Sequence, residues 1–413
     1  MDDPRGPVSR NAGRRWVRRG AVLIVALAVA GIVATLLGSC ASFGGKPDAA
    51  QQARIEDSPQ WHDGRFHNAE PIWNDTGSAL RRSFASTPGS APDTPVPVVA
   101  HDGRVFATPP ASGLRFTWFG HSSMLLEVDG ARVLIDPVWS RRPSPVAWLG
   151  PARWYAPPLA LEDLPAIDAV LISHDHYDHL DRETVEALDA RRVRFVVPLG
   201  VGAHLRAWGI PAARIHELDW WESVRIGALD ITATPARHAS GRINPESNAT
   251  LWAGFAIAGP VHRAWYSGDT GFHSSLDRIG ERLGPFDLTL IEAGQYDADW
   301  PDWHLGPELA VEAHRRVRGE VMVPVHWALF KLAHHGWTEP AERVLAAAAC
   351  RGVDTRIPRP GQSIEPARER TTRWWPDMPW QSAAEHSVVA TLAGDPAQRV
   401  GIPDCRLVAR PAG

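Results

Sequence analysis

A single short turn concentrates side chains that commonly bind metals. The segment is Ser173-His174-Asp175-His176-Tyr177-Asp178-His179, and it directly follows the apolar run at residues 169–172. That run is typical of a buried strand, which places the segment in the turn at the strand's end. Catalytic Zn²⁺ sites use imidazole nitrogen and carboxylate oxygen, with one position left for water. The turn therefore predicts a site that shares its side chains between two neighbouring metal ions, and the alternative is a solvated polar turn.

Isolated histidines and aspartates elsewhere in the chain could complete such a site. His238, Asp269 and His326 each stand directly after a short apolar run. Each residue alone is more often a turn-capping aspartate or a hydrogen-bonded histidine. Two metals need more ligands than one turn supplies, however, so three such residues at strand ends favour additional ligands.

Several longer sequence motifs, each of two to six residues, are also distinctive. They include Thr117-Trp118-Phe119-Gly120-His121-Ser122, Asp136-Pro137, Leu218-Asp219-Trp220-Trp221, Gly268-Asp269-Thr270-Gly271, Gly284-Pro285-Phe286-Asp287-Leu288 and His326-Trp327. Together they resemble the metallo-β-lactamase superfamily, and within it the N-acylphosphatidylethanolamine-hydrolysing phospholipase D branch with its bacterial relatives. The resemblance extends from about residue 64 to about residue 365. The ligand set alone identifies only the superfamily, whereas the phrases at 218–221 and 284–288 are more specific to the branch.

The resemblance implies an α/β fold of the αββα metallo-β-lactamase type, a sandwich of two sheets between helical layers, preceded by an N-terminal arm. It also implies two Zn²⁺ ions per chain. Carried over position by position, His174, His176 and His238 hold one zinc, Asp178, His179 and His326 hold the second, and Asp269 bridges them. A water shared by two zinc ions becomes hydroxide near neutral pH, and this bridging hydroxide is the expected nucleophile.

Other residues near the predicted ligands are candidates for substrate chemistry. His304 stands where the family has a histidine, and we expect it to act with Asp269 in catalysis, although capping the following helix is the alternative. Trp303, before it, replaces a polar residue expected in the animal enzymes, which leaves head-group recognition open. His121 is expected to support the site, and Tyr177 either contacts substrate or packs over the turn. We group Tyr177, His121 and Trp303 as tentative substrate-binding residues.

The first forty residues have the pattern of a targeting segment. A basic stretch at residues 14–19 precedes an uncharged apolar run at 21–37, and Leu37-Gly38-Ser39-Cys40 resembles a lipobox. Cys40 is then the site of lipidation, and the alternative is a retained membrane anchor. Both interpretations place the body in the bacterial cell envelope, anchored to the membrane and outside the cytoplasm. Cys350 and Cys405 either pair or remain free.

Composition and local patterns divide the rest of the chain. Residues 41–113 are rich in Pro, Ser and Ala and predict a tether and an irregular arm. Residues 114–366 predict the hydrolase domain, with helices at about 181–190, 307–319 and 340–350. Residues 367–413 form an extension of unknown role.

The function expected from these features is a zinc-dependent phosphodiesterase. The expected substrate is an N-acylphosphatidylethanolamine-like phospholipid, cleaved with phospholipase D regiochemistry. The chain's 19 tryptophans suit membrane interfaces, whereas its net charge of −4 argues against a nucleic-acid partner. The alternatives are a lactonase or nuclease-like phosphodiesterase on the same scaffold, or a non-catalytic envelope lipoprotein. Oligomeric state stays open.

Overall fold

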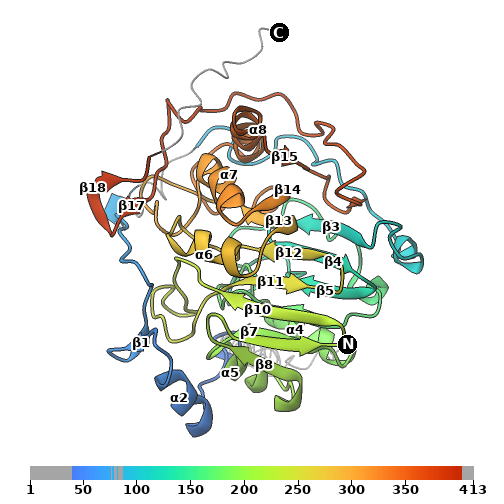
Figure 1. Cartoon of the computed structure of the whole chain (residues 1–413), viewed down its shortest axis with the longest axis vertical. Helices are drawn as coiled ribbons and strands as arrows, with labels where there is room; N and C mark the ends of the chain where they lie inside the picture. The colour runs from blue at the N-terminus through green and yellow to red at the C-terminus, as the bar shows by residue number, and fades with distance from the viewer. Residues whose placement is uncertain (1–39, 76, 79–80, 82–86, 402–413) are drawn as a thin grey trace, which may run out of the picture.

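The computed structural model describes residues 40–75, 77–78, 81 and 87–401 (Figure 1). The predicted targeting segment up to residue 39 and Cys405 lie outside the described residues. Within the described part of the chain, no helix is long and apolar enough to span a bilayer.

Two seven-stranded sheets form the centre of the molecule. The first contains, in spatial order, β16 (Ser363–Ile364), β3 (Leu114–Gly120), β4 (Ser123–Val128), β5 (Ala131–Ile135), β6 (Ala169–Leu171), β7 (Arg194–Pro198) and β8 (Ile215–Leu218). The second contains β15 (Asp354–Thr355), β14 (Gly319–Val325), β13 (Phe286–Glu292), β12 (Arg263–Tyr266), β11 (Gly254–Ala258), β10 (Leu229–Thr234) and β9 (Ser223–Ile226).

Both sheets repeat one pairing pattern. Strands β3, β4 and β5 pair antiparallel, and β5 to β8 continue in parallel. Likewise β9 to β12 pair antiparallel, and β12 to β15 continue in parallel. Because parallel strands end at the same edge of their sheet, each sheet collects several strand ends at one edge.

Hydrophobic side chains separate the molecule into layers. Alternate residues of a strand face opposite sides of its sheet. Leu126 of β4 therefore joins the core between the sheets, together with Ile231 and Leu290 of the second sheet. Its neighbour Leu125 faces the other way, and packs in a cluster with Val185 and Leu188 of the helical layer.

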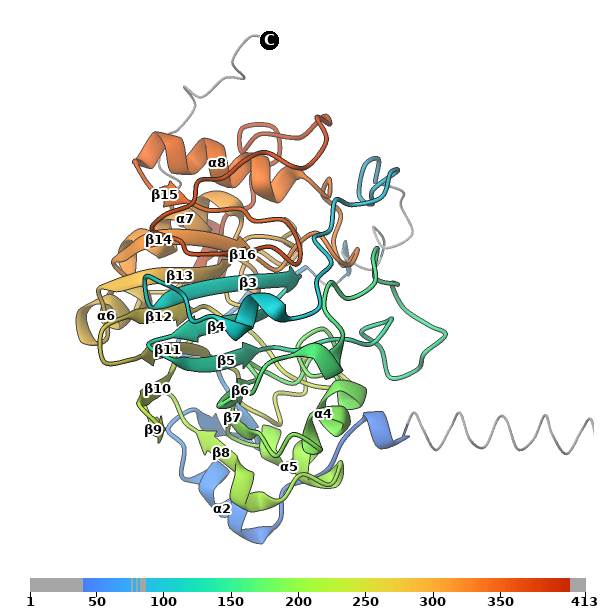
Figure 2. The same cartoon turned by 90° about the vertical axis from the view of Figure 1, so that its right-hand side faces the viewer.

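The outer layers are helical, and the αββα prediction is confirmed. Helices α4 (Arg182–Asp189) and α5 (Val201–Ala207) pack on the first sheet. Helices α6 (Ser275–Arg282), α7 (Pro307–Arg316) and α8 (Glu339–Arg351) pack on the second (Figures 1 and 2). The three predicted helices correspond to α4, α7 and α8. Single 3-10 turns are η1 (Arg104–Ala107), η2 (Leu161–Asp163) and η3 (Ala212–Arg214).

Helix α4 fixes the ligand-rich turn to the body. Asp181 occupies the N-cap position as predicted, but its side chain does not bond the helix backbone. Its carboxylate instead accepts hydrogen bonds from Thr184 Oγ1 and from the backbone N–H groups of Trp139 and Ser140. Asp181 therefore ties the start of α4 to the loop after β5.

The arm is more regular than predicted. It contains helix α2 (Ala49–Glu56), which begins with a capping box at Asp48, and a hairpin of β1 (Trp61–His62) and β2 (Arg65–Phe66). Hence the expectation of an irregular arm is wrong for this stretch. The hairpin is docked as expected, because Phe66 is buried and its N–H bonds Asn248 O at 2.8 Å.

The C-terminal extension also joins the folded body. Trp375 is buried, and both it and Trp374 pack against the core between the sheets. Strands β17 (Thr391–Leu392) and β18 (Asp395–Arg399) form a small separate hairpin. The buried Thr391 lies within the core of the protein rather than on its surface.

Candidate metal site

The strand ends of both sheets bring the predicted ligands together. His174 follows β6 of the first sheet, and the ligand turn continues from it. The second sheet contributes His238 after β10, Asp269 after β12 and His326 immediately after β14. The site therefore lies where the edges of the two sheets meet.

Three histidines form a first cluster. His176 Nδ1 lies 2.9 Å from His174 Nε2 and 3.3 Å from His238 Nε2. Donor atoms about 2.1 Å from one tetrahedral zinc ion lie roughly 3.4 Å apart. These three nitrogens therefore have the spacing of ligands around one ion, in the combination that the sequence predicts.

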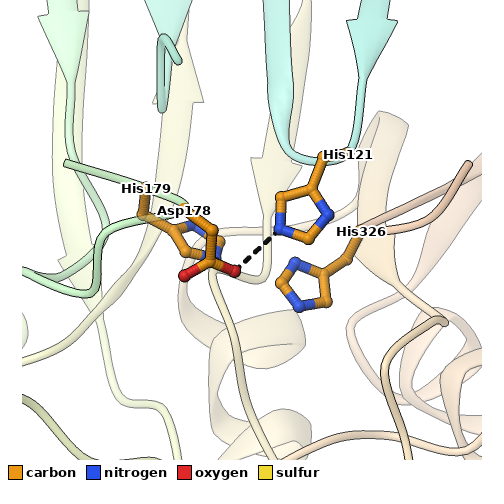
Figure 3. Close-up of side chains that lie close together, drawn as sticks. All are labelled: His121, Asp178, His179 and His326. Atoms are coloured by element: carbon orange, nitrogen blue, oxygen red, sulfur yellow. Dashed lines mark hydrogen bonds and ion pairs between the residues drawn. The ribbon is translucent and has the colours of Figure 1, made fainter. Parts of the chain in front are cut away.

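The second cluster contains Asp178, His179 and His326, with His121 beside them (Figure 3). Asp178 Oδ2 lies 3.4 Å from His179 Nε2 and 2.8 Å from His121 Nε2. His121 comes from the β3–β4 turn. It therefore adds an imidazole to the three residues that the sequence predicts here.

Asp269 lies between the two clusters. Its Oδ2 is 3.0 Å from His179 Nε2, and 3.9 Å from both His174 Nε2 and His238 Nε2. Its Oδ1 is 3.1 Å from His326 Nδ1. One carboxylate thus faces imidazoles of both clusters, which is the position a bridging ligand requires.

The chemistry of this site fits bound cations. His179 Nε2 and Asp269 Oδ1 are buried and make no hydrogen bond. Burial lowers the pKa of His174 well below its usual value, which keeps its imidazole neutral and able to coordinate. Burial raises the pKa of Asp269, but the adjacent His179 and His326 outweigh it and hold the pKa well below its usual range. Buried carboxylates beside imidazoles are a typical metal-binding set.

Hydrogen bonds on the far side of the rings orient the candidate ligands. Asp136 Oδ2 lies 2.7 Å from His179 Nδ1. The same carboxylate accepts from Ser173 N, Ser173 Oγ and Tyr266 Oη. His238 Nδ1 lies 3.0 Å from Trp303 O. Contacts of this kind fix the tautomer and direction of a coordinating imidazole.

His304 reaches the same site from the loop before α7. Its Nδ1 lies 2.8 Å from Glu292 Oε2 and 3.9 Å from Asp269 Oδ2, and its ring stacks on that of His326. Helix α7 has no side-chain cap, so His304 is not a capping residue. Although burial lowers its pKa, the neighbouring Glu292 raises it above the usual value overall. His304 therefore tends to hold a proton beside the clusters.

The tentative substrate residues have different surroundings. Tyr177 packs beneath Arg242, whose guanidinium carbon lies 4.0 Å from the ring centre. Trp303 is half-buried, with its ring 5.9 Å from that of His238. His121 contacts Asp178, as described above. The arrangement brings Trp303 and His121 to the clusters, and gives Tyr177 a packing contact at their rim.

Two buried carboxylates at the site were not predicted as functional. Asp136 follows β5, and Glu292 is the last residue of β13. Burial raises the pKa of Glu292 to about 7. Both residues stand directly after apolar runs, so the strand-end criterion that selected Asp269 would have found them as well.

The layered α/β fold and the His/Asp clusters define a metal-dependent hydrolase. A family model described as the Beta-lactamase superfamily domain matches residues 131–327, which carry every predicted ligand. The chain belongs to the metallo-β-lactamase superfamily.

Relatives of two kinds match this chain. An uncharacterized protein of Mycobacterium tuberculosis is 46% identical over 88% of this chain and 99% of its own length. The N-acyl-phosphatidylethanolamine-hydrolyzing phospholipase D 1 of Caenorhabditis elegans is 39% identical over 54% of this chain and 65% of the worm protein. The mitochondrial enzyme of that name from Saccharomyces cerevisiae is 31% identical over 58% of this chain and 53% of the yeast protein.

Proposed function

We propose that this metal-dependent hydrolase is a zinc-dependent phosphodiesterase with two zinc ions per chain. The carrying observation is that Asp269 lies between two clusters of candidate ligands, at 3.0 Å from His179 and 3.9 Å from His174. His174, His176 and His238 would hold one ion, and Asp178, His179 and His326 the other. Two such ions supply Lewis acidity and lower the pKa of water. A phosphodiester anion suits this cationic centre.

The names of two relatives support an N-acylphosphatidylethanolamine-like phospholipid as the proposed substrate of this chain. Both bear the name of phospholipases that hydrolyse this lipid, although each matches only part of its length. Phospholipase D regiochemistry breaks the bond between phosphorus and the head-group oxygen. The products are phosphatidic acid and an N-acylethanolamine.

We assign His304 the role of donating a proton to the departing alkoxide oxygen. Glu292 holds its Nδ1 at 2.8 Å, which leaves Nε2 as the free edge of the ring. A protonated His304 can donate to the leaving oxygen as a general acid. Asp136 and Trp303 meanwhile keep His179 and His238 in fixed orientations.

A lipid product screen tests this proposal. The protein is incubated with a mixed bacterial lipid extract supplemented with N-acylphosphatidylethanolamine, with and without a chelator, and products are identified by mass spectrometry. Chelator-sensitive release of phosphatidic acid and N-acylethanolamine is the expected result. Turnover of lactones or of nucleotide phosphodiesters alone would instead favour the other hydrolases of this scaffold. Failure to turn over any generic phosphodiester would favour a binding lipoprotein.

We further propose that Cys40 is the lipid-modified N-terminus of a protein anchored in the cell envelope. The proposal rests on the basic stretch, the apolar run and the lipobox-like sequence before Cys40, and Cys40 itself is an exposed free thiol. Intact-mass measurement of membrane-extracted protein should show loss of residues 1–39 and an added mass of acyl chains. A full-length unacylated chain would instead support a retained anchor.

A further inference from the structure

Two loops near the ligand turn expose apolar side chains on one face of the molecule. We call this the loop face, and define it by residues 140–150, residues 241–247 and Ser42. Ser42, Ala147, Tyr177 and Arg242 line one cavity, which places the two loops beside each other. Next to these lining residues, Trp148 is 68% exposed, Leu149 57% and Ile243 79%. Clustered exposed side chains of this size mark a binding surface.

The N-terminal end of the described chain leaves from the same face. Arg242 Nε donates to Ser42 O at 2.7 Å, and Trp208 Nε1 donates to Ala41 O at 2.7 Å. Figure 2 shows this start of the chain and the 140–150 loop on the same side of the molecule. The sequence before Cys40 contains the uncharged apolar run at 21–37. Anchoring of the chain at this end, by the proposed lipid on Cys40 or by the apolar run if it is retained, would bring the loop face to the bilayer surface.

Charge and composition favour lipid over protein as the partner. Arg141 is exposed beside the apolar side chains, and arginine attracts anionic phosphate. Tryptophan with neighbouring arginine is common where proteins contact the headgroup region. The loop face also adjoins the metal site, because His176 Nε2 lies 3.1 Å from Pro245 O.

We propose that the loop face docks on an anionic phospholipid bilayer and presents the metal site to lipid headgroups. Its benefit to catalysis rests on the proposed phospholipid substrate, whereas docking itself does not. The test uses the full chain reconstituted in vesicles of phosphatidylethanolamine and phosphatidylglycerol. Brominated acyl chains should quench part of the wild-type tryptophan fluorescence, and Trp148→Phe should remove that part. Unchanged quenching in Trp148→Phe would overturn docking whether or not the protein is a phospholipase.

A matched pair of variants then connects docking to turnover. Ile243→Asp places a charge in the loop face, whereas Val261→Asp does so in the β11–β12 turn, where Val261 is 75% exposed. Ile243→Asp should lower turnover of vesicle lipid roughly ten- to hundredfold, the effect of losing one buried aliphatic side chain. It should leave a soluble phosphodiester unaffected, and Val261→Asp should change neither. Equal losses on both substrates, or concentration-dependent dimers that Ile243→Asp abolishes, would overturn the proposal.

A second inference concerns the role of the C-terminal extension. Behind the metal site, Arg237 and Asp302 form a fully buried ion pair at 3.0 Å. Arg237 directly precedes the candidate ligand His238, and Asp302 directly precedes Trp303, whose carbonyl orients that ligand. The ion pair is therefore formed by residues that lie one position before His238 and two positions before His304 in the chain.

Thr391 of β17 completes this pair from the extension. Its N–H and Oγ1 donate to Asp302 at 2.7 and 2.5 Å, and Arg237 Nη1 donates to Thr391 O at 3.1 Å. The arm closes the other side, because Trp73 N donates to Asp302 at 2.8 Å and Arg237 donates to Pro71 O. We infer that Thr391 is a positioning residue, through which the extension holds the ligand His238 and the proton donor His304 in place.

Metal affinity separates this role from a purely structural one. Thr391→Val removes the hydroxyl and keeps the side-chain shape, and it should weaken metal binding in a chelator competition about tenfold. Thr391→Ser, which restores the hydroxyl, should recover the affinity. The control is Thr371→Val in the same extension, whose Oγ1 bonds Ile357 N and Thr355 O away from the site. A Thr391→Val protein that loses only thermal stability, or a Thr371→Val protein equally impaired in metal binding, would overturn the inference.

Discussion

The two sheets contribute to the metal site in different ways. The first sheet presents most of its candidate ligands on one turn after β6, and Asp136 of the same sheet supports that turn. The second presents single residues at separate strand ends, and distant segments support them. Asn68 of the arm, for example, bonds both the N–H and the carbonyl of His238. One half of the site is therefore built locally, and the other depends on contacts between distant parts of the chain.

Substitution of Asp269, which lies between the two clusters of candidate ligands, should have the largest effect on turnover. Asp269→Asn removes the charge that faces both clusters, so we expect turnover to fall by more than the roughly 10²–10⁴-fold of general acid–base catalysis. The assay is kcat at saturating zinc, with metal content measured by elemental analysis. Near-normal kcat with two metals bound would refute the bridging role of Asp269.

Loss of His304, the proposed proton donor, should have the next largest effect on kcat. His304→Ala should lower kcat by about 10²–10⁴-fold and leave metal content unchanged, because His304 is outside the proposed ligand set. Glu292→Gln keeps His304 but replaces the carboxyl group that contacts its Nδ1, and we expect a smaller loss of kcat. If His304→Ala has no effect on kcat, the histidine only packs between His326 and Glu292.

The local support of the first half should act mainly on metal affinity. Asp136→Asn removes the negative charge beside His179 and weakens the hydrogen bond that Ser173 N donates to residue 136. We therefore expect metal binding to be about 10–100-fold weaker. Chelator competition measures this effect. Tyr266→Phe removes only one donor to Asp136 and is the milder control. If Asp136→Asn leaves the metal affinity unchanged, the turn at residues 173–179 keeps its ligands in place without Asp136.

The distant support of the second half should have the smallest single effect. Asn68→Ala deletes two hydrogen bonds to the His238 backbone, at 2.9 and 2.8 Å. We expect the free energy of unfolding to fall by about 1–3 kcal/mol, as measured by urea denaturation. Asn244→Ala, in an exposed loop where the side chain bonds Glu246 N, should stay within about 0.5 kcal/mol of wild type. Equal stability of the two variants would show that the hydrogen bonds from Asn68 of the arm do not stabilise the position of His238.

The same division explains what could be predicted from sequence. Strand runs ending in His174, His238, Asp269 and His326 were recognisable, since periodicity and the polar residue at the strand end are local signals. Glu292 and Asp136 also follow apolar runs, but a lone carboxylate is usually a surface residue, so the sequence alone does not assign either of them a role at the site. The positions of Thr391 and Asn68 depend on chain segments that meet only in the folded protein, and no local pattern marks them.

The site also joins the two sheets mechanically. His121 pairs with Trp327 as an isolated bridge, and the N–H of His326 bonds His121 O at 2.9 Å, so backbone from each sheet meets beside the candidate ligands. A cation held by side chains from both sheets would bind the folded protein far better than the unfolded one. Ligands of this kind add about 1.4 kcal/mol of folding stability for each tenfold rise in free concentration above Kd. The fraction of the chain that is folded would then follow the supply of metal in its surroundings.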